Sequence, residues 1–235
     1  MTPELDLLEI PSRQWLSDYE EAASTSYMRK KYNRAARLKA KADYIEAVCP
    51  FVKNGTPGVV FDIGPGPGEF LELCLHSGCP VMGVEPPSGE DGMGDDYWNL
   101  SRLMHHRQRL PVSYTGWQSL VGGDFPGENS VALFNSQGSW AQSYSNFLTG
   151  EPHHVNHDAK AQRWRFCEEL AEAWAEAFIW MRSRLIDGGS IIIYDNATGT
   201  DRDQYVYQRV MQAASQASGL IEIWRRSPVF ACWRK

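Results

Sequence analysis

The amino-acid sequence predicts an α/β domain in which a largely parallel sheet carries helices on both faces. Five short apolar runs alternate with helical or loop segments, which is the pattern of parallel strands joined by crossover helices. One of these runs passes directly into a glycine-rich loop and then into a helical pattern. Two further apolar runs flank a turn near the last residue. With 235 residues, the chain is long enough for one well-buried domain and too short for two generous ones.

Two helices are expected ahead of the first strand. A helix over residues 14–23 follows the start signal Pro11-Ser12. A second helix over 27–48 ends before Pro50, because the residue that precedes a proline avoids helical torsion angles. We expect residues 1–54 to form an N-terminal helical cap over one end of the sheet.

The alternating elements follow in order along residues 55–235. Strands are expected at 58–63, 81–84, 112–115, 131–135, 190–194, 220–224 and 229–233. Helices are expected at 69–76, 97–109, 164–185 and 201–217. Asp187-Gly188-Gly189 is expected to end the third of these helices, and Gly219 to end the fourth. His105 and His106 fall on the helix at the sheet edge, where we expect no functional role.

Net charge restricts the class of partner. The value of −6 argues against a nucleic-acid partner, because neutralising phosphates normally requires a basic face. One basic cluster on the second helix nevertheless contains Arg29, Lys30, Lys31, Arg34, Arg37, Lys39 and Lys41. We interpret it as a solvated helix face; a clamp for a phosphorylated or carboxylated acceptor is the alternative, and RNA binding is the third.

The sequence also predicts a cytoplasmic location. Its first residues lack the basic-then-apolar plan of a signal peptide, and no apolar run approaches the ~20 residues that span a bilayer. The five cysteines are odd in number and scattered, so they indicate neither a disulfide framework nor a Cys-x-x-Cys zinc pair. We therefore expect a reducing compartment and no membrane partner.

Residues 59–70 hold the clearest functional motif. A short apolar strand leads into a loop with glycines at alternate positions, namely Gly64, Gly66 and Gly68. Such a loop brings bare backbone close to a ligand, and the amide groups at the following helix start face a polar or anionic group on it. Pro65 and Pro67 fix two φ angles and stiffen the loop. The motif therefore predicts a preformed site for a nucleotide-type cofactor.

The glycine spacing bears on which cofactor binds. A dinucleotide-binding loop has the pattern Gly-x-Gly-x-x-Gly, whereas here the third glycine comes one residue early and Glu69 takes its place. A glutamate beside a pyrophosphate would be repulsive. Glu85 ends the second strand, where an acid can accept hydrogen bonds from both ribose hydroxyls of either cofactor type.

These motifs carry a resemblance to a known family. Asp-x-Gly-x-Gly-x-Gly after a strand, and Leu-x-x-Gly-Gly before the isoleucine strand, resemble motifs of the class I S-adenosylmethionine (AdoMet) methyltransferases. The resemblance spans about residues 55–235. It implies a three-layer Rossmann-like methyltransferase fold with a seven-stranded, mostly parallel sheet in which one of the last strands is antiparallel. It also implies AdoMet as the cofactor and S-adenosylhomocysteine as its product.

The resemblance assigns roles to individual residues. Asp62 matches the acid that orders the loop and approaches the methionine ammonium, and Asn135 lies where the family places residues between cofactor and acceptor. Trp117 stands where relatives have Gly-Asp or Gly-Asn, so it either stacks on adenine or belongs to the core. The residues expected to bind the cofactor are Asp62, Gly64, Pro65, Gly66, Gly68, Glu85, Trp117 and Asn135.

Methyl transfer to a hydroxyl or amine also requires a group that accepts a proton. Asp195-Asn196 resembles the pair in the magnesium-dependent catechol-type O-methyltransferases, but those enzymes have an aspartate where this chain has Asn135. Mg²⁺ is therefore disfavoured and no metal site is expected; Asp195 is a base, a substrate anchor or a capping residue. His154 and His157, in the long segment 136–158, are the other candidate bases.

The expected function is methyl transfer to a small-molecule acceptor that can be anionic, with oxygen as the first choice of acceptor atom. Nitrogen and carbon remain open. Two alternatives stand beside it: a nicotinamide-dependent oxidoreductase on a similar sheet, and a non-catalytic partner protein that retains the fold.

Overall fold

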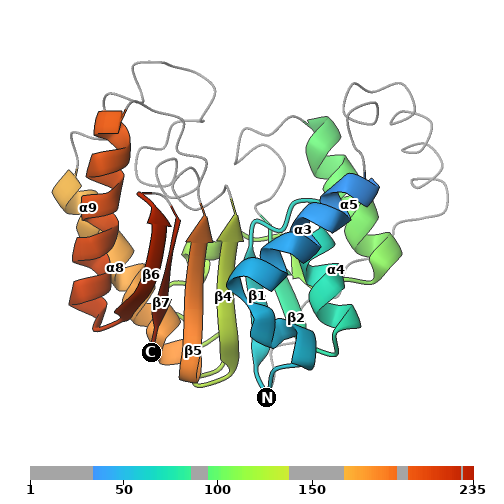
Figure 1. Cartoon of the computed structure of the whole chain (residues 1–235), viewed down its shortest axis with the longest axis horizontal. Coiled ribbons are helices and arrows are strands. Elements are labelled where there is room, and N and C mark those ends of the chain that lie inside the picture. The colour runs from blue at the N-terminus through green and yellow to red at the C-terminus, as the bar shows by residue number, and fades with distance from the viewer. Residues whose placement is uncertain (1–33, 86–94, 138–166, 195–200, 229) are drawn as a thin grey trace.

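A computed structural model describes residues 34–85, 95–137, 167–194, 201–228 and 230–235 (Figure 1). Its centre is a seven-stranded sheet with the strand order β3-β2-β1-β4-β5-β7-β6. The strands are β1 (Val59–Ile63), β2 (Val81–Val84), β3 (Val112–Ser113), β4 (Val131–Gln137), β5 (Leu185–Tyr194), β6 (Ile221–Ser227) and β7 (Phe230–Arg234). β7 runs antiparallel to both of its neighbours, and the other paired strands are parallel.

Helices cover both faces of this sheet. The α-helices are α3 (Arg34–Val48), α4 (Glu69–His76), α5 (Asp95–Gln108), α8 (Cys167–Arg184) and α9 (Asp201–Ser218), and the 3₁₀ turns are η1 (Pro50–Asn54) and η2 (Trp117–Leu120). Within the described ranges, no helix is long and apolar enough to cross a membrane. The predicted three-layer, Rossmann-like α/β fold with one antiparallel strand is confirmed.

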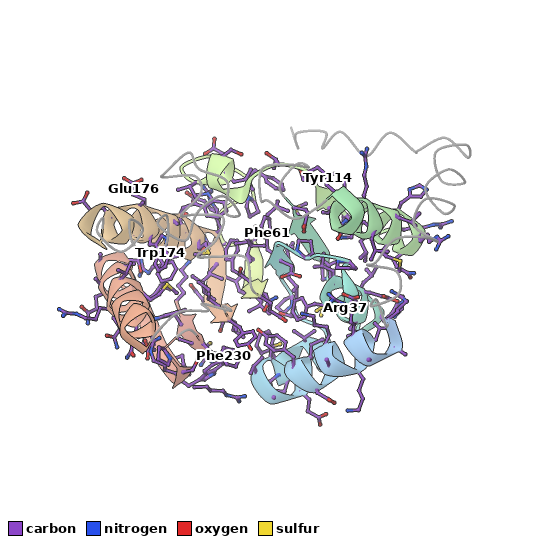
Figure 2. The ribbon with its side chains drawn as sticks, turned by 90° about the horizontal axis from the view of Figure 1, so that it is seen from above. Arg37, Phe61, Tyr114, Trp174, Glu176 and Phe230 are labelled. Carbon is purple, nitrogen blue, oxygen red and sulfur yellow. The ribbon has the colours of Figure 1, made fainter. Side chains whose placement is uncertain are left out.

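Alternation along the strands divides the core into two parts. On one face, α8 and α9 pack against each other and against side chains such as Phe61 and Ile191. On the other face, α3, η1 and α4 pack against side chains such as Val60 and Ile192. Figure 2 shows this arrangement from above. The two buried faces explain why the central strands read as continuous apolar runs.

The helix α3 is the described part of the expected N-terminal segment. It ends at Val48 as predicted, because Pro50 follows. Ile45 and Val48 pack against the sheet face beside α4, so this half of the helix is part of a layer. Lys41, in the middle of the helix, contacts Gln137 at the carboxyl end of β4. Residues 1–33 lie outside the described ranges, and the domain boundary at residue 54 stays a prediction.

The start of β5 differs from the prediction. The helix α8 ends at Arg184, and β5 begins at once with Leu185 instead of after Asp187-Gly188-Gly189. The pairing with β4 is irregular there, since Val131 faces Leu185 whereas Leu133 faces Ser190. The Asp-Gly-Gly sequence therefore forms an irregular stretch inside the strand, and the φ of +75° at Gly188 is one that glycine adopts readily.

Candidate functional site

The glycine loop lies between the carboxyl end of β1 and the start of α4. All three glycines have positive φ: 70° at Gly64, 54° at Gly66 and 86° at Gly68. Two backbone hydrogen bonds hold the loop, from the Gly64 N–H to the Val84 carbonyl at 2.9 Å and from the Gly68 N–H to the Pro65 carbonyl at 3.1 Å. These torsions require glycine, because other residues adopt them only with strain.

Gly68 has a second reason to be glycine. A Cβ atom there would lie 2.4 Å from Leu110 Cδ1, closer than real Cβ atoms approach their neighbours, and 3.0 Å from His105 Cδ2, which is tighter than most real Cβ contacts. We expected the glycine loop as a whole to bring bare backbone close to a ligand. At Gly68 the structure shows close packing between the loop and the end of α5 with the residues that follow it.

Glu85 lies directly after β2 and points to this loop. Its side chain is buried, and the Gly66 N–H donates to its Oε2 at 3.0 Å. The Glu85 N–H in turn donates to the Ser113 carbonyl at 2.9 Å, which fixes the residue at the end of the sheet. The acid is therefore joined to the glycine loop, as the ribose-binding role requires, although that role stays a prediction.

His105, for which we expected no functional role, contacts the glycine loop. Its Nε2 lies 2.5 Å from the Gly66 carbonyl oxygen, and its Nδ1 lies 3.0 Å from the Tyr114 hydroxyl. A carbonyl oxygen only accepts, so Nε2 donates its hydrogen and Nδ1 accepts from Tyr114. Burial lowers the pKa of His105 to about 4, so the ring is neutral near pH 7. His105 and Glu85 thus hold the two backbone polar groups of Gly66.

A hydrogen-bonded chain joins the ends of β1 and β4. Asp62 and Asn135 are opposite each other in the sheet, and Asn135 Nδ2 donates to Asp62 Oδ1 at 2.7 Å. The Tyr44 hydroxyl of α3 donates to Asn135 Oδ1, also at 2.7 Å. Burial raises the pKa of Asp62 to about 7, so this carboxyl is close to half-protonated at neutral pH. The predicted cofactor residues Asp62 and Asn135 therefore contact each other directly.

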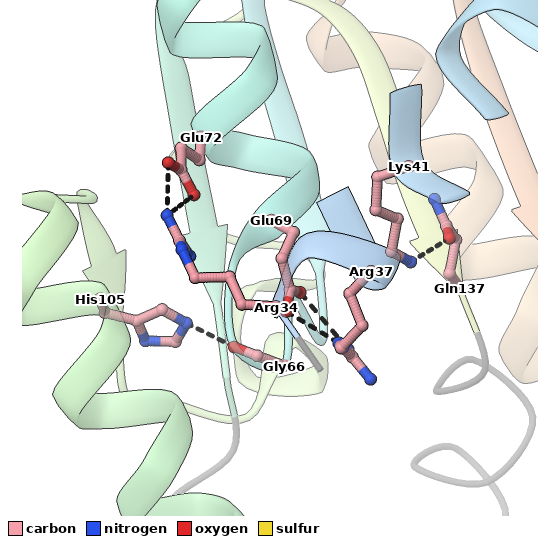
Figure 3. Close-up of polar contacts among 8 residues, drawn as sticks. All are labelled: Arg34, Arg37, Lys41, Gly66, Glu69, Glu72, His105 and Gln137. Carbon is pink, nitrogen blue, oxygen red and sulfur yellow. Dashed lines mark hydrogen bonds and ion pairs between the residues drawn. The ribbon is translucent and has the colours of Figure 1, made fainter. Parts of the chain in front are cut away.

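The basic residues of α3 differ from the prediction of a solvated face. Arg34 Nη2 contacts the Glu72 carboxylate at 2.6 Å, and Arg37 contacts Glu69 at 2.7 Å through Nε and 3.3 Å through Nη2 (Figure 3). Figure 2 shows Arg37 between α3 and α4. Glu69 is fully buried, and Arg37 compensates its charge. Repulsion between Glu69 and a pyrophosphate is therefore a weaker argument than the sequence suggested.

We predict that Arg37→Met destabilises the protein by about 1–3 kcal/mol, because buried Glu69 loses its guanidinium partner. The effect is smaller than for a fully buried pair, since Arg37 is 37% exposed. Urea unfolding measures the change. Lys39→Met is the matched control on the same helix, because Lys39 and Asp43 form an exposed pair whose loss costs at most about 0.5 kcal/mol. Equal effects of the two substitutions would contradict a structural role for Arg37.

The candidate catalytic residues are not tested by the structure. Asp195, His154 and His157 lie outside the described residues. The backbone of Trp117 begins η2 shortly after β3, but its side chain lies outside what the structure describes, so stacking on adenine stays a prediction. Sequence reasoning did not anticipate three hydrogen-bonded contacts at this site, namely Tyr44 with Asn135, His105 with Gly66, and Tyr114 with His105. Nothing in the sequence separates buried His105 from half-buried His106.

Comparison with known proteins gives similarity to solved structures only. No protein-family model and no curated protein matches the sequence. An AdoMet-dependent methyltransferase from Archaeoglobus fulgidus is 17% identical with a TM-score of 0.47, and the match covers 78% of this chain and 69% of that one. Geranyl diphosphate C-methyltransferase from Streptomyces coelicolor A3(2) is 12% identical with a TM-score of 0.45, covering 91% and 82%.

A third structure is the 1,6-didemethyltoxoflavin-N1-methyltransferase of Burkholderia thailandensis. It is 13% identical with a TM-score of 0.44, and the match covers 94% of this chain and 85% of that one. All three TM-scores are below 0.5, so the assignment of the fold rests on the strand order and helix layers described above.

Proposed function

We propose that this protein binds AdoMet at the glycine loop and transfers its methyl group to a small-molecule acceptor. The observation that carries the proposal is the junction of Glu85 with Gly66, which joins an acid at the end of β2 to the glycine loop at the end of β1. The strand order, with β7 antiparallel at its predicted place, supports the same choice.

The described residues fit such a cofactor. The Glu85 carboxylate is an acceptor beside the loop, where the two ribose hydroxyls need one. Asp62 and Asn135 supply oxygen atoms at the neighbouring strand ends for the methionine ammonium. When bound, the cofactor supplies an electrophilic methyl group on its sulfonium. The chain then has to hold donor and acceptor in line, and such alignment accounts for much of the rate enhancement.

We expect the acceptor to be a small molecule, which the net charge of −6 supports against nucleic acid. Oxygen is our first choice of acceptor atom, with Asp195, His154 and His157 as candidate bases. Nitrogen and carbon are alternatives that product analysis distinguishes.

The first experiment is calorimetry with AdoMet, S-adenosylhomocysteine and NADH. We expect AdoMet and its product to bind with dissociation constants on the order of micromolar, and NADH not to bind. Glu85→Ala should weaken AdoMet binding at least about 30-fold, because two charge-assisted hydrogen bonds are lost. Glu85→Gln keeps one acceptor oxygen and should have an intermediate effect, and exposed Glu128→Ala should have none.

Absence of heat with both sulfur ligands, on protein shown to be folded, would remove the proposal. Tight binding of NADH would favour the oxidoreductase alternative. The ion pair of Arg37 with Glu69 weakens one argument against this alternative, because Arg37 compensates the negative charge that would repel a pyrophosphate. Incubation of the full chain with radiolabelled AdoMet and a metabolite extract then distinguishes an enzyme from a non-catalytic partner protein.

A further inference from the structure

Lys41 differs from the other described cations of α3. Arg34, Arg37 and Lys39 each contact a carboxylate, on Glu72, Glu69 and Asp43 respectively. Across the ranges that the structure describes, Lys41 forms no ion pair. Its ammonium donates instead to the amide oxygen Oε1 of Gln137 (Figure 3). A neutral amide oxygen does not compensate the charge of an ammonium, so this cation is incompletely neutralised.

Gln137 has an unsatisfied group of its own. It is the last residue of β4, and its Nε2 is buried with no hydrogen-bond partner in good geometry within the described ranges, although the Gln137 side chain also interacts with the Tyr44 hydroxyl. A buried donor without a partner costs roughly 1–3 kcal/mol, which is why such atoms are uncommon in folded proteins. Among the described residues, the ammonium of Lys41 therefore has a neutral acceptor only, and the amide N–H groups of Gln137 have no acceptor in good geometry.

The pair is located at the candidate functional site. Asn135, two residues before Gln137 on β4, binds Asp62 at the end of β1, and the glycine loop follows Asp62 directly. Burial lowers the pKa of Lys41, and the nearby Asp62 carboxyl acts in the opposite direction. A second negative charge brought by a ligand would stabilise the ammonium further.

We propose that Lys41 and Gln137 bind a carboxylate of a ligand held in this site. One cation and one amide match a group with a single negative charge and two oxygen atoms, and the other described cations of α3 are already paired. The inference rests on the proposed function, which offers two sources of a carboxylate. These are the methionine end of AdoMet and a carboxylated acceptor.

Calorimetry with AdoMet and decarboxylated AdoMet distinguishes these sources, because the two compounds differ only in the carboxylate. If the carboxylate is that of AdoMet, Lys41→Met weakens AdoMet binding about 10- to 100-fold. The same substitution changes the affinity for decarboxylated AdoMet by no more than about 2-fold relative to the wild type. Lys39→Met, the control on the same helix, leaves both affinities unchanged.

A second arm tests the acceptor. Protein with and without saturating S-adenosylhomocysteine is titrated with benzoate and with its neutral analogue benzamide. If the carboxylate belongs to an acceptor, the wild type prefers benzoate, Lys41→Met loses this preference, and AdoMet affinity is the same in both proteins.

Gln137→Glu is the second variant, and it tests the pair even where Lys41→Met does not fold. It keeps Lys41 but supplies an internal carboxylate that competes with the ligand, so it should reduce the same affinity in the same direction. If Lys41→Met and Gln137→Glu both bind AdoMet as the wild type does, and benzoate is not preferred, the inference is overturned while the proposed function stands. If the folded wild type binds no AdoMet, the proposed function fails, and the benzoate arm still tests the Lys41–Gln137 pair.

Discussion

Gly68→Ala is expected to weaken S-adenosylhomocysteine binding at least about 30-fold and to destabilise the protein by roughly 2–4 kcal/mol. At a φ of 86°, a Cβ atom at residue 68 is strained and would lie 2.4 Å from Leu110 Cδ1. Leu110 is buried, so it has little room to move. His105 Cδ2 lies 3.0 Å from the same position, and the His105 ring contacts the Gly66 carbonyl. If the added methyl group displaces His105, Gly66 and its hydrogen-bond partner Glu85 are expected to shift as well.

Gly78→Ala is the matched control for this prediction. Gly78 has a φ of 80°, but nothing lies within 4 Å of the Cβ that alanine would add. It therefore isolates the torsional cost, about 1–2 kcal/mol, from the packing cost. Urea unfolding and calorimetry on both variants provide the comparison. If Gly68→Ala resembles Gly78→Ala in stability and in affinity, the close packing at Gly68 has no consequence for the site.

Asp62→Asn is expected to stabilise the protein at pH 8, by on the order of 2–4 kcal/mol, while reducing AdoMet affinity about 10-fold. The pKa of Asp62 is about 7 in the folded protein, against 3.8 as its ordinary value. Between these values the folded state binds more protons than the unfolded state, so this residue lowers stability as the pH rises from about 4 to about 7. Asparagine removes the ionisation and can still accept from Asn135.

The increase in unfolding free energy that Asp62→Asn brings should become smaller as the pH falls toward about 4. Urea unfolding between pH 4 and pH 8 measures this increase. His105 acts in the opposite sense, because its pKa is about 4 in the folded protein and 6.5 ordinarily. The unfolded state binds more protons in that window, so His105 lowers stability as the pH falls from about 6.5 to about 4. In the wild type, the opposite effects of Asp62 and His105 on the change of unfolding free energy with pH partly cancel. In Asp62→Asn, stability should therefore rise with pH over this range.

Exposed Asp124→Asn serves as the control and should leave the pH profile unchanged. A profile for Asp62→Asn that runs parallel to that of the wild type would contradict an ionisation of Asp62 linked to folding.

The elements that the sequence predicted well are those with a local pattern. The helix at 69–76 and the strand at 81–84 have the predicted bounds, because apolar spacing, glycines and prolines act within a few residues. The third strand is shorter than predicted, ending at Ser113 at the edge of the sheet. The fifth starts at Leu185, because its pairing with β4 extends past the Asp-Gly-Gly sequence. Pairing between distant strands therefore decided what the local pattern left open.

By itself, the sequence determined the succession of strands and helices along the chain, the glycine loop and the position of the acid Glu85. These features depend on neighbouring residues and on the rules of parallel sheets. Only the tertiary structure decided how the charged and polar groups pair. It placed Arg37 against Glu69, His105 against Gly66 and Lys41 against Gln137. The physical reason is that hydrogen bonds and ion pairs depend on distances of a few ångströms between segments far apart in the chain, and residue type alone does not specify those distances.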